Sequence, residues 1–183
     1  QATGDSSYAE PCSDVVSFLL KYQQASGELP YVVDDPGMLH FQCFQYHAFI
    51  YLDTWNYYQM SGDQRVLELL RGVLRFLAGG VHDSGYGYYQ CDQLYRTVNY
   101  HTAAIAAALG TCKNLGLEPK QEEEYCQLSQ RAFDYFLKQQ LPDGSFTHSR
   151  GDYHILCDQR RYPRYQAMML YHLLHTSTLH SAH

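Results

Sequence analysis

Apolar side chains recur at helical spacing in several stretches of the chain. Between residues 41 and 55 they occupy positions i, i+3, i+4 and i+7, and residues 98–112 repeat this pattern. A third stripe runs from Val66 to Leu77, directly after a Ser-Gly-Asp turn in which Asp63 is a predicted helix N-cap. These stretches are predicted to be amphipathic helices.

The helices are predicted to form three copies of one hairpin. Each copy ends its first helix in a glycine-bearing turn, as in "SFLLKYQQASGEL", "RFLAGGVHDSGYG" and "YFLKQQLPDGSF". The second helix of each copy opens on a related triplet centred on Tyr46, Tyr100 or Tyr165. The third copy is expected over residues 120–140 and 163–175. The sequence therefore predicts an all-α fold of three tandem α/α hairpins, with six helices and no strand.

The length of 183 residues fits one domain. We expect an N-terminal extension over residues 1–13, the hairpin-repeat domain over 14–176 and a C-terminal tail over 177–183. No membrane span is predicted, because no apolar run approaches the roughly 20 residues that a membrane helix needs. The net charge of −6 argues against nucleic acid as a partner.

The connections within each hairpin are long. They cover about residues 24–39, 78–94 and 141–162, whereas the links between hairpins are short. Loops longer than about 12–15 residues are usually functional or disordered. In an alternating up-and-down array all three long loops emerge at one end, which we call the long-loop rim, and they are rich in tyrosine and aspartate. The sequence therefore predicts a functional site at this rim.

Tyrosine dominates the composition, since 18 Tyr outnumber the 13 Lys and Arg together. A tyrosine ring offers a flat apolar face to a sugar and a hydroxyl to its OH groups. Carboxylates among such rings are candidate acids and bases, because burial raises the pKa of a carboxyl group. We therefore expect a small-molecule or oligosaccharide substrate, whereas tyrosines on helix faces, such as Tyr51 and Tyr125, are expected to pack.

The candidate site residues come from the long loops and from the first turns of the second helices. The expected catalytic residues are Asp83, Tyr88, Tyr100 and His101. The expected substrate-binding residues are Tyr31, His47, Tyr86, Tyr89, Arg96 and Phe146. His47 and His101 occupy equivalent repeat positions, where an imidazole could transfer a proton near pH 7 or hydrogen-bond the loop above it. Arg96 would stabilise an anionic intermediate.

The glycine turns and tyrosine-led inner helices resemble the α/α-toroid superfamily, which includes terpenoid cyclases, protein prenyltransferases, six-hairpin glycosidases, polysaccharide lyases and uronyl epimerases. The resemblance covers about residues 14–175 and implies a partial α/α toroid. The stretch "FLKQQLPDGSF" is similar to the glutamine–tryptophan repeat of terpenoid cyclases, with Gln140, Gly144 and Phe146 in the places of its Gln, Gly and Trp. The DxDD motif of the squalene–hopene type is absent from the sequence, which weakens a cyclase assignment.

A second resemblance covers roughly residues 44–105. The stretches "DSGYGYYQCD" and "NYHTAAI" are similar, in their order, to the C-terminal domain of glucuronyl C5-epimerases. The resemblance implies acid–base epimerase or lyase chemistry that uses Tyr88 or Tyr89 together with Tyr100 and His101.

No metal and no other cofactor is predicted. His40, Cys43 and His47 share one helical face and could supply three zinc ligands, but the Asp-x-Cys motif of the prenyltransferases is not present. The triplet "CDQ" occurs twice, at residues 91–93 and 157–159, and is interpreted as a repeat feature. The six cysteines are compatible with buried thiols or with one or two disulfides.

Three functions stay open at this point. The first is a carbohydrate-active protein that binds a glycan or uronate-like substrate at the long-loop rim. The second is a terpenoid-cyclase-like unit whose rings stabilise a carbocation. The third is a non-catalytic binding or scaffold fragment, because three hairpins supply about half of the helices that close a toroid. We therefore expect a second copy, or the remainder of a larger chain, to cover the inner faces.

Overall fold

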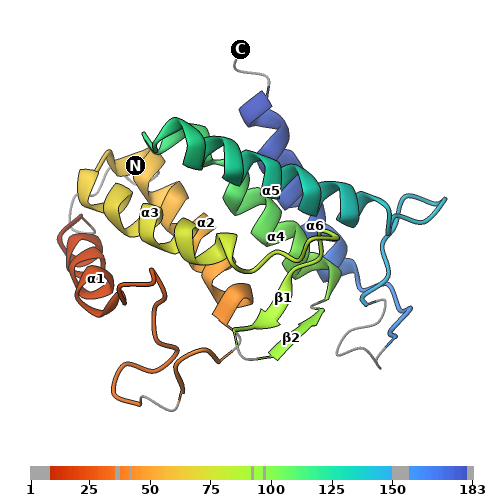
Figure 1. Cartoon of the computed structure of the whole chain (residues 1–183), viewed down its shortest axis with the longest axis horizontal. Coiled ribbons are helices and arrows are strands. Elements are labelled where there is room, and N and C mark those ends of the chain that lie inside the picture. The colour runs from red at the N-terminus through yellow and green to blue at the C-terminus, as the bar shows by residue number, and fades with distance from the viewer. Residues whose placement is uncertain are drawn as a thin grey trace.

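The computed structural model describes residues 9–35, 38–41, 43–91, 93–96, 98–149 and 157–180. These residues are mostly helical, as the all-α prediction requires. The six helices are α1 (Ala9–Tyr22), α2 (Cys43–Ser61), α3 (Gln64–Ala78), α4 (Asn99–Gly110), α5 (Pro119–Leu137) and α6 (Pro163–His180), shown in Figure 1. Helix α1 therefore begins inside the predicted extension, and α6 continues past the predicted end of the repeat domain.

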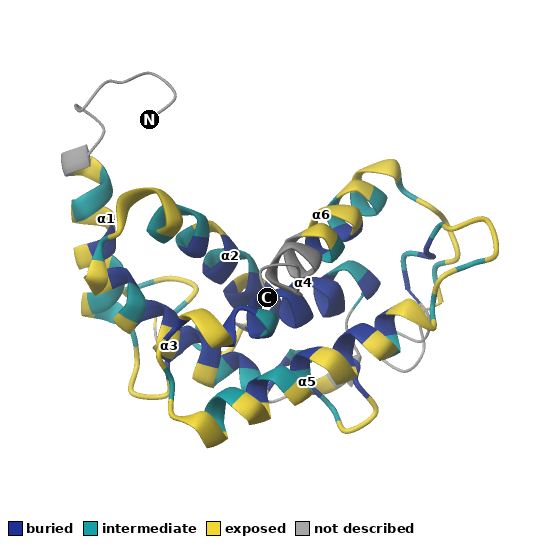
Figure 2. Ribbon diagram, turned by 90° about the horizontal axis from the view of Figure 1, so that it is seen from above, coloured by how far each residue is buried: buried dark blue, intermediate teal, exposed yellow. Residues whose placement is uncertain are grey.

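The helices form an inner row and an outer row. Helix α4 lies at the centre, where it packs against α2, α5 and α6. Figure 2 shows α1, α3 and α5 along the convex side, with α2, α4 and α6 inside them. The residues of α4 from Ala103 to Leu109 are all fully buried, and five of these seven are alanine. Small side chains let neighbouring helices approach α4 from several directions.

Helices α3 and α6 begin where local sequence signals predict. The Asp63 carboxylate caps α3 by accepting a hydrogen bond from the backbone N–H of Arg65 at 3.0 Å. Pro163 begins α6, where its fixed φ suits the first helical turn. Within the described residues, no helix combines the length and apolar character needed to cross a membrane.

The glycine turn is repeated three times in backbone geometry. In each copy the first residue donates its N–H to the carbonyl four residues later: Gln24 to Glu28 (2.8 Å), His82 to Tyr86 (2.9 Å) and Leu141 to Ser145 (2.8 Å). The fourth residue of each turn is a glycine with positive φ, and its N–H returns to the first residue's carbonyl. The same turn therefore occurs three times in the structure, at the three places where the sequence repeat predicts it.

The second long loop contains two strands, so the prediction of a strand-free chain is wrong here. Strands β1 (Tyr88–Gln90) and β2 (Gln93–Arg96) pair antiparallel, with Tyr88 opposite Arg96. Aromatic residues favour extended backbone, and only two residues separate the strands, so a hairpin is the local solution. Strand β1 also packs against α2.

Both ends of the helical array expose apolar side chains. Helix α1, at one end, exposes Val15 and Phe18, and α6, at the other end, exposes Leu170 and Leu174. More than half of the Leu170 and Leu174 side chains is open to solvent.

Candidate functional site

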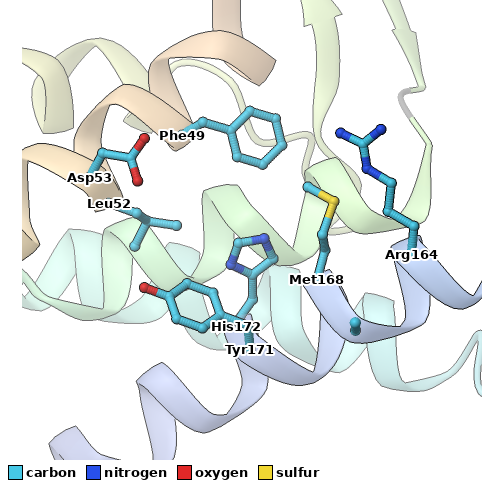
Figure 3. Close-up of a pocket in the computed structure, with 8 residues that line it drawn as sticks. Phe49, Leu52, Asp53, Arg164, Met168, Tyr171 and His172 are labelled. Carbon is cyan, nitrogen blue, oxygen red and sulfur yellow. The ribbon is translucent and has the colours of Figure 1, made fainter.

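A groove lies between α2 and α6. Two adjoining pockets, of about 540 and 350 Å³, share Phe49, Arg164 and Met168 and together form what we call the α2–α6 groove. Figure 3 shows Phe49, Leu52 and Asp53 of α2 facing Met168, Tyr171 and His172 of α6 across the larger pocket. Tyr100 and His101 of α4 line the smaller pocket, next to Tyr46 and Tyr165.

The groove unites the tyrosines that mark the three repeats. Tyr46, Tyr100 and Tyr165 all line its smaller pocket. The rings of Tyr100 and Tyr165 stack with centroids 4.3 Å apart and planes 6° from parallel, and His148 stacks on Tyr165 at 4.9 Å. Sequence reasoning placed only Tyr100 in the site. The repeat spacing itself is the signal that would have identified Tyr46 and Tyr165.

Each long loop is tied to its inner helix by an equivalent hydrogen bond, which we call the loop latch. Its donors are backbone N–H groups and its acceptors are side chains: Leu29 to His47 Nε2 (2.6 Å), Gly87 to Thr102 Oγ1 (3.1 Å) and Phe146 to Gln166 Oε1 (2.9 Å). Of the two roles considered for His47, proton transfer or a hydrogen bond to the loop above it, the structure contains the hydrogen bond. The sequence repeat makes His101 the equivalent of His47. In the second repeat, however, the acceptor is Thr102, one residue after His101.

His101 is turned toward the groove instead. Its ring lies 4.0 Å from that of Tyr100 and 5.6 Å from that of Phe49. Burial, together with the nearby His148 and His172, lowers the pKa of His101 to about 3, so its imidazole is neutral near pH 7. Burial and the neighbouring Tyr165 raise the pKa of Tyr100 well above its usual value, so its hydroxyl stays protonated. The groove thus offers a neutral imidazole beside a phenol that donates.

Arg164 supplies positive charge to both pockets of the groove. Its side chain is exposed, and Figure 3 places it at the opposite end of the larger pocket from the Asp53 carboxylate. Among the described residues no ion pair engages Arg164. A guanidinium in this position can receive a carboxylate or another anionic group from a ligand.

Three predicted residues gather at the long-loop rim beside the groove. The Tyr31 ring contacts Tyr46 edge-on at 5.2 Å, and its hydroxyl raises the pKa of Tyr46 through a side-chain hydrogen bond. Tyr89 is close enough to Tyr46 to contribute to the same shift. Tyr88 packs against Phe44 at the base of α2, with centroids 6.5 Å apart.

Three other predicted residues lie away from the groove. Tyr86 is buried, stacked on His82 at 4.3 Å and packed against Tyr135 of α5. Asp83 is fully exposed and pairs with Arg131 of α5 at 3.6 Å. Phe146 is buried in the core, where it stacks on Phe136 at 4.2 Å. The Arg96 side chain lies outside the described residues, although its backbone belongs to β2.

The zinc-ligand set considered from helical spacing is described only at His40 and His47. The His47 ring accepts the latch hydrogen bond from Leu29, and the Cys43 side chain lies outside the described residues. His40 instead contacts Glu28, a residue from the other end of the first long loop, and Cys91 of the β-hairpin turn. Helical periodicity could not predict the group of Glu28, His40 and Cys91, because none of the three residues belongs to a helix and they come from two different loops.

Comparison with known proteins adds no relative: no family model, curated protein or solved structure matches the chain.

Proposed function

We propose that the α2–α6 groove binds a glycan or a uronate-like sugar. The observation that carries this proposal is the convergence of Tyr46, Tyr100 and Tyr165, one from each hairpin, beside the guanidinium of Arg164. Pockets of 350 and 540 Å³ fall within the roughly 300–1,000 Å³ range of small-ligand sites.

The groove residues suit the two kinds of surface that a sugar presents. Phe49 and Tyr46 offer apolar rings to the C–H side of a pyranose, whereas Tyr100 and Tyr165 stack on each other and would contribute their phenol hydroxyls, which can bond its OH groups. Arg164 would pair with the carboxylate of a uronate through charge-assisted hydrogen bonds. The protonated Tyr100 would act as a donor to the ligand.

Acid–base turnover in this groove would assign distinct roles to two adjacent residues. His101 would be the base and Tyr100 the acid, but the lowered pKa of His101 makes its neutral imidazole a weak base and the raised pKa of Tyr100 makes its hydroxyl a weak acid, so both shifts favour ligand binding over turnover. The raised pKa of Tyr100 disfavours a phenolate base. Asp83 takes no part in this proposal, because its ion pair places it against α5.

A terpenoid-cyclase-like function is the weaker alternative. Stacked aromatic rings can stabilise a carbocation by cation–π contact. A carbocation also needs protection from water, whereas Arg164 and Asp53 are exposed residues that line this groove.

We also propose that the three hairpins are a partial α/α toroid completed by a second copy of the chain. This idea is supported by the inner and outer rows of helices and by the exposed apolar residues at both ends of the array. A non-catalytic scaffold would expose the same apolar residues. Sugar binding in the groove distinguishes the carbohydrate-active function from such a scaffold.

The binding proposal is tested by calorimetric titration with glucuronate and galacturonate oligosaccharides and with their uncharged counterparts. Loss of the guanidinium in Arg164→Gln should weaken uronate binding by about 10- to 100-fold, the equivalent of a charged hydrogen bond. Arg131→Gln, on the outer helix α5, is the matched control and should bind as the parent does. Absence of binding by any saccharide, or selective binding of isoprenoid diphosphates, contradicts the proposal.

A further inference from the structure

Three side chains of metal-binding type converge beside the long-loop rim. Glu28 lies in the turn at the start of the first long loop, His40 lies at the end of that loop, and Cys91 occupies the turn between β1 and β2. One oxygen, one nitrogen and the sulfur of these residues all lie within 4.8 Å of one another. The group is separate from the α2–α6 groove, since none of the three residues lines either pocket.

The Glu28 carboxylate is buried although it belongs to a loop. Its residue is only 1% exposed, and its Oε1 accepts a hydrogen bond from the His40 backbone N–H at 2.8 Å. The other oxygen lies 2.7 Å from His40 Nδ1. Burying a carboxylate is costly unless charged or polar partners compensate for the lost water. Here the backbone N–H and the ring of His40 supply such partners, so the carboxylate joins the two ends of the loop.

The backbone of His40 is held in an uncommon conformation. Its φ is +67°, and it is the one non-glycine residue with positive φ in the described part of the chain. Such a conformation is disfavoured for a residue with a side chain and persists where surrounding contacts impose it. Here it brings both the N–H and the ring of His40 onto the same carboxylate.

The arrangement is convergent and does not resemble a nucleophile relay. In a Cys–His–Glu relay the carboxylate and the sulfur lie on opposite sides of the imidazole, separated by the ring and two hydrogen bonds. A Glu28 oxygen and the Cys91 sulfur lie within 4.8 Å of each other, which is too close for that geometry. Three ligand atoms this close to one another are compatible with a shared metal ion.

We propose that Glu28, His40 and Cys91 form a zinc site with an open fourth position. Carboxylate oxygen, imidazole nitrogen and thiolate sulfur are all zinc ligands, and three protein ligands leave room for a water molecule. Tetrahedral zinc holds its ligand atoms roughly 3.3–3.8 Å apart, so ligand atoms up to 4.8 Å apart need to close by about 1 Å, whereas the 2.7 Å contact between Glu28 and His40 Nδ1 needs to open by about 0.6 Å. The carboxylate and the thiolate together balance the charge of Zn²⁺. Binding releases the thiol proton of Cys91 to solvent.

The test uses the whole chain without a histidine tag, stripped of metal and then titrated with Zn²⁺ or Co²⁺ alone. We expect one metal ion per chain by elemental analysis, and a near-ultraviolet thiolate-to-cobalt charge-transfer band with Co²⁺. Cys91→Ser should abolish this band, and Glu28→Gln should weaken Zn²⁺ binding at least tenfold. Cys157→Ser, which removes an exposed thiol elsewhere, is the control and should keep the band.

A second measurement needs no variant, so it is independent of any folding defect in Glu28→Gln. Zn²⁺ should slow the alkylation of Cys91 by iodoacetamide at least tenfold, as measured by peptide mass spectrometry, and leave the rate at Cys157 unchanged. A missing charge-transfer band in the parent protein, a band that survives Cys91→Ser, or equal alkylation with and without Zn²⁺ would overturn the zinc site. None of these outcomes bears on sugar binding, which is measured separately through Arg164.

Discussion

The imidazole of His47 accepts a hydrogen bond from the backbone N–H of Leu29 at 2.6 Å and so ties the first long loop to α2. His47→Ala would leave this buried N–H without an acceptor, and we expect a loss of about 1–3 kcal/mol in the free energy of unfolding. His47→Gln should recover much of that loss, because Gln166 forms the equivalent bond in the third repeat.

Urea denaturation measures both variants. An unchanged free energy of unfolding in His47→Ala would contradict the structural role, whereas a catalytic role would show as loss of function in a normally folded His47→Gln.

The buried His101 should make stability depend on pH. Its pKa is about 3 when folded and near 6.5 when unfolded, so the unfolded chain binds its proton first as pH falls. This contribution to stability is fully present above pH 6.5 and is lost on acidification, by up to about 1.4 kcal/mol per pH unit. The free energy of unfolding should therefore drop by up to about 2 kcal/mol between pH 6.5 and 5.0.

Urea titrations at these two pH values test this, with His101→Asn as the comparison. The variant should show a smaller drop, although not none, because burial also lowers the pKa of His148. An identical pH dependence in parent and variant would contradict a buried neutral imidazole at position 101.

Two glycines of the repeated turn should respond differently to alanine. A Cβ at Gly27 would lie 1.8 Å from the carbonyl oxygen of Gly72, whereas at Gly144 the nearest atom is 4.0 Å away. Both have positive φ, so Gly144→Ala should cost only the backbone term of about 1–2 kcal/mol. Gly27→Ala adds a clash with backbone and should cost about 2–5 kcal/mol. Thermal unfolding gives the order, and equal losses would refute the close approach.

Cys112 and Cys126 are candidates for oxidative cross-linking. Their sulfur atoms lie 2.6 Å apart as thiols, with Cys112 in the short helix Cys112–Asn114 and Cys126 in α5. Burial raises the pKa of Cys112, so a thiol-specific oxidant should act slowly at neutral pH. Diamide treatment should link these two residues and remove two hydrogen atoms from their combined mass, as peptide mapping would show. Preferential linkage of Cys157 to either one would contradict the geometry.

The exposed apolar residues of α6 should mediate self-association. Leu170→Glu together with Leu174→Glu should reduce the mass measured by light scattering from that of an oligomer to that of one chain. Leu94→Glu replaces an exposed leucine away from both ends of the array and should leave the association intact. A parent protein that is monomeric at all concentrations would argue against completion by a second copy.

The helices and the repeat were predictable because their signals are local. Asp63 caps a helix through a bond two residues away, and the glycine turns close within five residues. The β-hairpin was missed because Tyr88 and its neighbours were interpreted only as loop residues that contact ligand.

The composition of the site was harder to predict because it depends on how loops fold back. Tyr86 and Phe146 look like rim residues in the sequence but are buried against α5. His47 and His101 both follow a tyrosine, yet they differ in role. His47 accepts the latch hydrogen bond in the first repeat, whereas in the second repeat the acceptor is Thr102, the residue after His101. The approach of Cys91 to Glu28 crosses two loops and has no periodic signature.

The loop latch has a consequence for how this fold can diverge. Its three acceptors are an imidazole, a hydroxyl and an amide, so the latch can be formed by any side chain that accepts a hydrogen bond from a backbone N–H. Duplicated units can therefore lose their likeness in sequence while they keep the same architecture. In the second unit, a threonine fills the structural role and the preceding histidine lines the groove.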